Sequence, residues 1–467
     1  MPFKVILLLY CVYACTQIDF RNFSFKLHVS APILARLFLG GGLLVILFES
    51  FFFDFCADLA HSKYWIRAFL GVNFFPTEVW FIFAGNLLMV CFVARNSFRF
   101  PAFVIRDGVG IYAFVGFIFV WYVYGVVQGN DFALECFREF GFTAFSIPPI
   151  LYFAPHVPLI SLFKRFSNVG VIAILLWCPI TLYSRLLSGG QETVLSHNSF
   201  IMVASFFIPY FFFSSVFISR WNLIGVVVAL MPFVAGFAKP MLGILFMSFV
   251  GVMGIAGYVT ENAGRKDLTS TRMKLILGSC VLGVFFCICL VGVNFLSGNR
   301  IVEIVRTTFL KERLKDSGEV FYGDLSGGRM AIWAAALESW EEKPILGHGL
   351  GAIVRAFSSG WVEKWQYHNY FFQILNSMGL MGTVFICAIL VMWFHRILRR
   401  LAFVEEIQQK IVFASMIVFV LNILFFGLYG HSLSYPPSSQ MFWLCVGFLS
   451  VLSRTTAEQI QFSGNTK

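Results

Sequence analysis

The sequence predicts an all-α integral membrane protein, with about 12–13 transmembrane helices and one large periplasmic loop that contains short helices. Of the 467 residues, 59% are hydrophobic and only 12% are charged, and the mean hydropathy is +0.81. A soluble domain has about 45–50% apolar and about 25% charged residues, so this chain has too few charges to cover a globule of its size with polar surface. The apolar excess must face lipid, which excludes a cytosolic enzyme, a disordered chain and a disulfide scaffold.

Apolar runs of about 20 residues, the length that spans a bilayer, follow one another along most of the chain. A shorter run, Val5–Ala14, is a candidate for a further span near the N-terminus. The twelve longer runs cover residues 31–53, 76–95, 109–127, 139–155, 168–187, 199–218, 221–239, 240–258, 273–296, 369–394, 410–428 and 436–453.

These runs, and the long polar stretch between two of them, divide the chain into four parts. We predict an N-terminal transmembrane bundle (1–296), a large periplasmic loop (297–368), C-terminal transmembrane helices (369–453) and a cytoplasmic tail (454–467).

The distribution of basic residues predicts the orientation. Lys and Arg cluster in every second short loop, at residues 95–106, 164–165, 220, 265–274 and 396–400. Cytoplasmic loops carry the excess of Lys and Arg, which places the loop 297–368 outside. That loop holds nine basic and nine acidic residues, so the formal charge of +10 comes from the rest of the chain, and nucleic acid is not an expected partner.

The long loop has the composition of a functional insertion. It holds 18 of the 58 charged residues, and loops of this length in a compact protein are usually functional. We expect a charged helical stretch over Val302–Lys315 and a second helix from Gly328 to Glu342. Pro344 and the glycines of Gly347–Gly351 end the second helix.

The second helix is predicted to be amphipathic. Its large apolar residues recur at i, i+3, i+7 and i+10: Met330, Trp333, Leu337 and Trp340. Such a face can lie on the membrane or cap the helical bundle.

Metal and cofactor sites are not indicated. The 11 cysteines lie in or beside apolar stretches without a CxxC pair, so we expect them to pack as small hydrophobic residues. The sequence has no Asp-x-Asp pair for a metal on a nucleotide-sugar phosphate and no Walker A motif for ATP. No cofactor is therefore expected.

Arg329 stands in the first turn of the second loop helix, three residues after the plausible N-cap Ser326. A cation there opposes the helix dipole at a cost of about 0.3–1 kcal/mol. An arginine beside free backbone N–H groups is well suited to a phosphate. The alternative is a surface arginine that reaches lipid headgroups.

His368 directly precedes Asn369 at the outer mouth of the next transmembrane helix. Imidazole has an unperturbed pKa near 6.5, which suits a general base that activates an alcohol. Asn369 is positioned to orient the ring or to hydrogen-bond substrate. The alternative is that the histidine is simply an amphipathic residue at the membrane boundary.

Three more basic residues are predicted at outer helix ends, where the positive-inside rule does not require them: Lys239, Arg138 and Arg185. Lys239 lies between two apolar runs, and a charge in such a stretch is a candidate functional residue. We predict that all three bind substrate. The alternative for Lys239 is that it caps a short outer turn.

Between Ser326 and Phe385 a series of motifs occurs in a fixed order. These are Ser326-Gly-Gly-Arg329, Trp333, Lys343-Pro-Ile-Leu-Gly-His-Gly349, His368-Asn369 and Gly379-Leu-Met-Gly382. In order, spacing and topology this series resembles the signature region of the bacterial O-antigen ligase and O-antigen polymerase family.

The resemblance implies a metal-independent, inverting glycosyltransferase of the membrane-embedded C type in the bacterial inner membrane. Its donor is a glycan on undecaprenyl diphosphate on the periplasmic side. Ligases pass the glycan to lipid A–core in lipopolysaccharide biosynthesis, and polymerases pass it to another lipid-linked repeat. By position, Arg329 matches the family's diphosphate-binding arginine, His368 its proposed acceptor-activating histidine, and Lys239 its second basic residue.

The sequence leaves the choice between ligase and polymerase open, with the ligase slightly favoured. A lipid-linked oligosaccharide transporter or flippase is the alternative from another class. Such transporters typically show repeated halves and charges near the bilayer midplane. In this sequence the charges of interest cluster in one outer loop, which favours the enzyme.

Overall fold

The computed structural model describes residues 31–53, 56, 74–95, 102–187, 197–236, 247–248, 250–255, 329–357, 361–364, 367–404, 406–428 and 432–464. These residues are 85% helical, with one pair of short strands. The elements are α2 (Ala31–Phe51), α5 (Pro76–Glu78), the π-helical turn η1 (Val79–Ala84), α6 (Gly85–Arg95), α7 (Ala102–Val127), α8 (Ala133–Phe140), η2 (Phe142–Ser146), α9 (Ile147–Phe153), η3 (Ala154–His156), α10 (Leu159–Leu187), α11 (His197–Ala204), α12 (Phe207–Phe217), α13 (Asn222–Gly236), α17 (Arg329–Glu342), β1 (Val354–Phe357), β2 (Trp361–Lys364), α18 (Tyr370–Ala402), α19 (Ile407–Phe426), η4 (Ser432–Ser434) and α20 (Pro436–Gly464).

Seven segments of the described chain are long and apolar enough to cross a membrane. They are Pro32–Phe51, Pro76–Val93, Gly108–Val127, Leu159–Thr181, Ser199–Phe217, Tyr370–Leu401 and Ile407–Phe426. The predicted class, an all-α multi-pass membrane protein, is therefore confirmed. The expected runs 5–14 and 273–296 lie outside the described residues, as does most of 240–258, so the total of 12 or 13 stays a prediction.

The predicted span 139–155 is not one continuous helix. It consists of the end of α8 followed by η2, α9 and η3, which are three short helical pieces. Pro148 and Pro149 occupy the first turn of α9, where a proline costs nothing because the N–H groups of a first turn have no partner in the helix. The missing N–H groups do prevent the hydrogen bonds of η2 from continuing without interruption into α9. Hydropathy alone cannot distinguish this broken path from a regular span.

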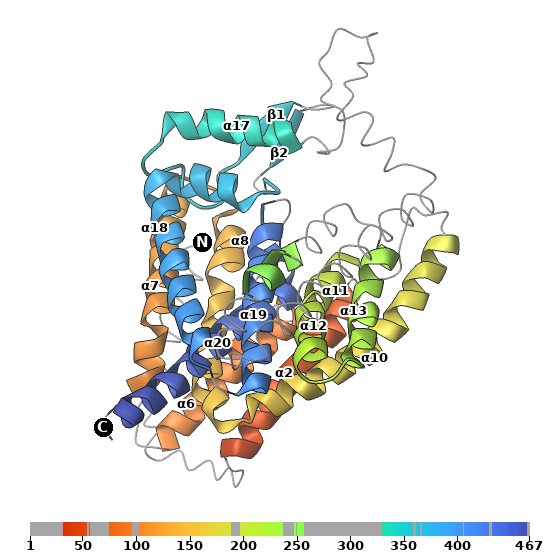
Figure 1. Ribbon diagram of the computed structural model, residues 1–467. Coiled ribbons are helices and arrows are strands. Elements are labelled where there is room, and N and C mark those ends of the chain that lie inside the picture. Colours follow the sequence, from red (N-terminus) through yellow and green to blue (C-terminus); the bar gives the residue numbers. More distant parts are fainter. Residues whose placement is uncertain are drawn as a thin grey trace.

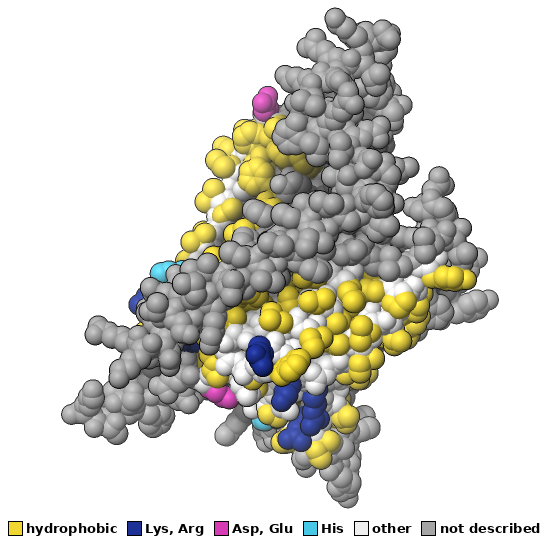
Figure 2. Space-filling model, turned by 45° about the vertical axis from the view of Figure 1, so that its right-hand side comes forward, with side chains coloured by type: hydrophobic (Ala, Val, Ile, Leu, Met, Phe, Trp, Pro, Cys, Tyr) yellow, Lys and Arg dark blue, Asp and Glu magenta, His cyan; other side chains and the backbone are white. Residues whose placement is uncertain are grey.

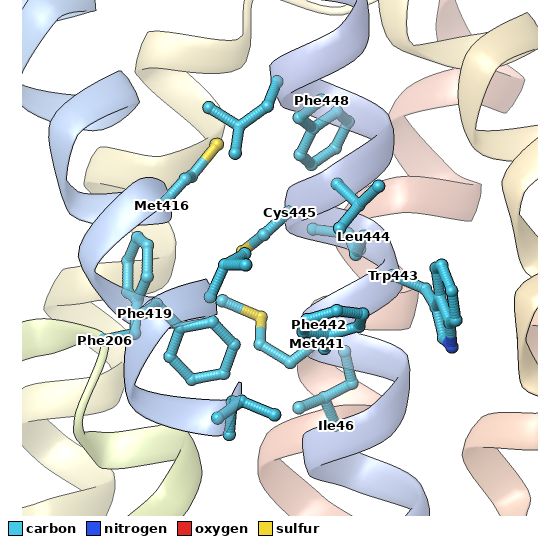
Figure 3. Close-up of a cluster of buried hydrophobic side chains, with 14 of the residues drawn as sticks. Ile46, Phe206, Met416, Phe419, Met441, Phe442, Trp443, Leu444, Cys445 and Phe448 are labelled. Carbon is cyan, nitrogen blue, oxygen red and sulfur yellow. The ribbon is translucent and has the colours of Figure 1, made fainter. Parts of the chain in front are cut away.

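Helices α19 and α20 form the centre of the bundle. Side chains of Met416 and Phe419 on α19 meet Met441, Cys445 and Phe448 of α20, all of them fully buried (Figure 3). Most of α19 is buried around its whole circumference, as expected for a helix surrounded by other helices rather than by lipid.

Helix α18 is broken in its first half. Gly379 has φ 65° and ψ −169°, a conformation that is almost restricted to glycine. A Cβ atom at this position would lie 2.2 Å from the carbonyl oxygen of Ile345. The break leaves backbone groups of α18 without partners inside the helix, and a segment of the preceding loop occupies the gap.

The segment 344–350 forms four backbone hydrogen bonds across this break. The N–H groups of His348 and Gly349 donate to the carbonyls of Asn376 and Ser377, at 2.9 and 2.8 Å. In the opposite direction, the N–H groups of Leu380 and Met381 donate to the carbonyls of Pro344 and Ile345, at 2.8 and 3.2 Å.

Helix α7 and the turn that follows it hold the other side of the same segment. Trp121 Nε1 donates to the carbonyl of Leu346 at 3.0 Å, and Asn130 Nδ2 donates to the carbonyls of His348 and Leu350 at 2.9 and 3.0 Å. Gly125 permits this approach, since a Cβ there would lie 2.4 Å from the Leu350 oxygen. Segment 344–350, called the connector below, is thus held between α7 and α18.

An outer layer covers this end of the bundle. Helix α17 and the strands β1 and β2 lie together above the start of α18, whereas the C-terminal end of α20 lies at the opposite end (Figure 1). The strands are antiparallel, with Val354 opposite Lys364 and Phe357 opposite Trp361. The helix predicted over 328–342 is confirmed as α17, but the hairpin was not expected from the sequence.

We predict that Gly379→Ala destabilises the protein by about 3 kcal/mol, because alanine is strained at this φ and its Cβ would overlap Ile345. The measurement is the thermal unfolding of the purified protein in detergent. Gly116→Ala is the matched control, since nothing lies within 4 Å of a Cβ at that position in α7. Equal melting temperatures for Gly379→Ala and the control would contradict the proposed role of the break.

Candidate functional site

Helix α17, which begins at Arg329, packs on α18 and β1. Its buried side chains are Ile332 and Ala336, which contact Val354 and Tyr367. Within the predicted apolar face, Leu337 is 38% exposed and Trp333 is half-buried, so a membrane contact of this face stays a prediction.

One hydrogen bond joins the two motifs that carry the predicted chemistry. Trp333 Nε1 donates to the carbonyl of Tyr367 at 2.8 Å, and the Trp333 ring stacks on Phe372 with centroids 5.5 Å apart. Tyr367 directly precedes His368. Arg329 stands four residues before Trp333 on α17, which corresponds to a rise of about 6 Å. The backbone of Arg329 is therefore about one helical turn from the residue that bonds to the neighbour of His368.

His368 adopts a left-handed backbone conformation, with φ 53°, and is half-buried. This conformation is uncommon for a residue other than glycine and costs about 1–3 kcal/mol, so it persists only where the surrounding structure imposes it. Both neighbours are anchored. Tyr367 is fully buried, and its hydroxyl donates to the Ala352 carbonyl at 2.9 Å and accepts from Asn376 Nδ2 at 2.7 Å.

Asn369 is the N-cap of α18. Its Oδ1 accepts from the N–H groups of Phe371 and Phe372, at 2.9 and 3.3 Å, and its Nδ2 donates to the Leu428 carbonyl at 3.0 Å. The side-chain amide is thus engaged with backbone groups and ties the start of α18 to the end of α19. A role of Asn369 in binding substrate stays a prediction.

Two titratable groups close to the site are unsuited to act as a base at neutral pH. Burial raises the pKa of Tyr367 well above its usual range, and burial raises the pKa of Cys136 to about 12. Both groups therefore stay protonated and neutral. The Cys136 sulfur accepts a hydrogen bond from Gln373 Nε2 at 3.6 Å, which joins α8 to α18.

His348 has a structural environment. Its Nε2 lies 2.7 Å from the carbonyl oxygen of Ser339 on α17, and its backbone belongs to the segment that crosses the break in α18. The flanking Gly347 and Gly349 both have positive φ, at 67° and 85°. This histidine links α17 to the connector and is not our candidate base.

Arg138 lies on α8, which packs beside the first turns of α18 through the Phe140 and Tyr370 rings, 5.1 Å apart. Its Nε donates to Glu78 Oε1 at 3.0 Å, and its guanidinium lies 5.4 Å from the centroid of the Phe75 ring. The side chain of Glu78 is 1% exposed and that of Arg138 is 20% exposed. The structure thus shows an ion pair of Arg138 with Glu78, and binding of substrate by Arg138 stays a prediction.

A second carboxylate, which the sequence reasoning missed, lies beside this pair. Glu49 at the end of α2 is fully buried and accepts a hydrogen bond from the Thr77 N–H at 2.7 Å. The sequence did contain a signal for this carboxylate cluster, because Glu49 and Glu78 both stand at the predicted outer ends of predicted spans. Two buried carboxylates next to one arginine make this a polar cluster of α2, α5 and α8.

The remaining predicted residues are placed only in part. Lys239 lies outside the described residues, and for Arg185 and Arg329 the structure gives the helix position, in the last turn of α10 and the first of α17, without the side chain. The described residues hold no group of three or more His, Cys, Asp or Glu side chains that could bind a metal. Metal independence stays a prediction.

Comparison with known proteins gives no assignment. No model of a protein family matches the chain, and no curated protein matches it.

We predict that Arg138→Met lowers the free energy of unfolding by about 2–4 kcal/mol, because it leaves the buried Glu78 carboxylate without its cation. Adding Glu78→Gln in the same chain should restore most of this loss. Thermal unfolding of the single and double variants tests the pair. Equal stability of Arg138→Met and the wild type would contradict a structural ion pair.

The double variant also tests the predicted role of Arg138 in binding. If Arg138 contacts substrate, the stabilised double variant should remain inactive, whereas a purely structural arginine predicts that activity returns with stability.

Proposed function

We propose that the chain is a glycosyltransferase of the bacterial inner membrane that acts on the periplasmic face. It moves an undecaprenyl-diphosphate-linked polysaccharide or oligosaccharide to a hydroxyl of lipid A–core, as an O-antigen ligase does. The observation that carries the proposal is the hydrogen bond from Trp333 to Tyr367. It links the helix that begins with Arg329 to the residue before His368, so that two distant motifs contribute to one site.

The chemistry requires one base and a cationic site for the leaving group. In the proposed step, His368 accepts the proton of the acceptor hydroxyl as the oxygen attacks the anomeric carbon. A new C–O bond forms, the bond between that carbon and the diphosphate oxygen breaks, and undecaprenyl diphosphate leaves with the electron pair. Attack from the side opposite the leaving group inverts the anomeric centre.

Arg329 is proposed to bind the diphosphate. Diphosphate is already a good leaving group, so it needs stabilisation of charge more than protonation. A guanidinium at the start of a helix can supply this stabilisation together with backbone N–H groups. Lys239 is proposed as a second cation, and neither role needs a metal ion.

Two further features support the site. The left-handed conformation of His368 lies between the anchored Tyr367 and Asn369, and sparsely populated backbone conformations occur often at functional sites. Arg329 and His368, the two residues assigned to the chemistry, also belong to the long loop rather than to an intramembrane path, and α17, which begins at Arg329, lies at one end of the bundle (Figure 1). This placement favours a transferase over a transporter.

We predict that His368→Asn reduces transfer by about 10²–10⁴-fold, because asparagine tolerates the left-handed conformation but cannot act as a base. The assay uses the purified protein, undecaprenyl-diphosphate-linked glycan, lipid A–core and a chelator. His348→Gln is the control and should retain most activity, since its amide can still donate to Ser339. Transfer by His368→Asn at the wild-type rate would overturn the assigned base.

Arg329→Ala should reduce transfer by about 10²–10³-fold while the protein still inserts in the membrane. Arg329→Lys should fall between this variant and the wild type, because lysine keeps the charge but loses the two-pronged geometry. An Arg329→Ala variant with near-normal transfer would show that the diphosphate is bound elsewhere.

A glycolipid gel of a deletion strain beside its parent distinguishes the alternatives. Bare lipid A–core with long glycans left on undecaprenyl diphosphate indicates a ligase, and core with a single repeat indicates a polymerase. An unchanged ladder would contradict both and point to other glycans or to a transporter.

A further inference from the structure

A groove between α2 and α10 lies at the end of the bundle opposite the candidate site. It has a volume of about 360 Å³ and is lined by the first halves of both helices and by the turn before α10. Arg36, Gly40 and Leu44 line it at intervals of four residues on α2, and Arg165 and Val169 do so on α10. One face of each helix therefore carries an arginine at the inner end and apolar residues toward the membrane centre.

The charge of this groove is entirely positive. No acidic residue lines it, and neither Arg36 nor Arg165 forms an ion pair with any residue that the structure describes. Both arginines are exposed. Lys and Arg side chains gather at the lower end of this face, below a broad hydrophobic surface (Figure 2). By the positive-inside rule this end of the bundle is cytoplasmic.

The apolar part of the groove opens toward the side of the bundle. Leu44 is 54% exposed and Val169 is 38% exposed, although both lie on segments that are long and apolar enough to cross the membrane. The space beside Gly40 is open, since a Cβ there would make only one ordinary contact, 3.6 Å from Leu162 Cδ1. The groove therefore combines a cationic entrance with an apolar channel along the lipid-facing surface.

We propose that this groove binds one anionic phospholipid of the cytoplasmic leaflet. The phosphate of the headgroup lies between Arg36 and Arg165, and an acyl chain runs along Gly40 and Leu44. Guanidinium groups bind phosphate oxygens through paired hydrogen bonds, and anionic lipids are attracted to basic residues at the cytoplasmic surface. A zwitterionic lipid would fill the channel equally well but would match the charge poorly.

The test is a titration of the full-length protein in detergent with phosphatidylglycerol that carries a fluorescent acyl chain, read by anisotropy. Loss of each arginine is expected to weaken binding about fivefold, so Arg36→Gln with Arg165→Gln should weaken it about 25-fold. Gly40→Leu fills the channel without changing its charge and should also weaken binding. The control is Arg220→Gln, which removes another exposed inner arginine, beside Trp221, and should leave binding unchanged.

Competition separates the sources of phosphate. Unlabelled phosphatidylglycerol should displace the probe, whereas phosphatidylcholine at the same concentration and sodium phosphate at millimolar concentration should not. Equal competition by phosphatidylcholine, displacement by free phosphate, or equal losses in the groove variants and in Arg220→Gln would overturn the proposal. Since neither arginine belongs to the candidate site, the outcome is independent of glycan transfer.

Discussion

The end of the bundle that carries the candidate site depends on one backbone arrangement, the insertion of segment 344–350 into the break of α18. A break in a transmembrane helix exposes N–H and C=O groups to an environment that offers them no water, and each group without a partner there costs several kcal/mol. Here the connector supplies two donors and two acceptors. The same segment is bonded to α7 and to the turn after it, so the break fixes α7, α18 and segment 344–350 relative to one another instead of weakening the fold.

The candidate site is assembled on this fixed base. The Tyr367 hydroxyl donates to the Ala352 carbonyl, just after the connector, and accepts from the side-chain amide of Asn376, just before the break. The backbone carbonyl of Tyr367 accepts a hydrogen bond from Trp333 on α17. These contacts surround His368 with residues that cannot move independently. Pre-organised groups need little reorganisation during reaction, which is where electrostatic catalysis gains most of its effect. The polar cluster of Arg138, Glu78 and Glu49 lies on helices that pack beside the same end of the bundle.

The membrane class, seven of the spans and helix α17 were predictable, because they depend on composition and on local hydropathy. The remaining features depend on contacts between distant residues. Gly379 could be recognised as part of a motif, but nothing near it in sequence indicates that Ile345 lies against it. The strands of the hairpin are four residues each, too short for a periodic pattern, and β1 packs against α17, which is distant from β2 in sequence. The Arg138–Glu78 pair likewise joins residues 60 positions apart.

The most direct test of this account is amide hydrogen exchange of the purified protein, followed in peptides that cover 344–350 and 377–382. If the connector and the broken helix are bonded as described, the amides of His348, Gly349, Leu380 and Met381 exchange slowly and at similar rates, because they open in one event. Rapid exchange of 344–350, at the rate of an open loop and beside a protected α18, would contradict the account.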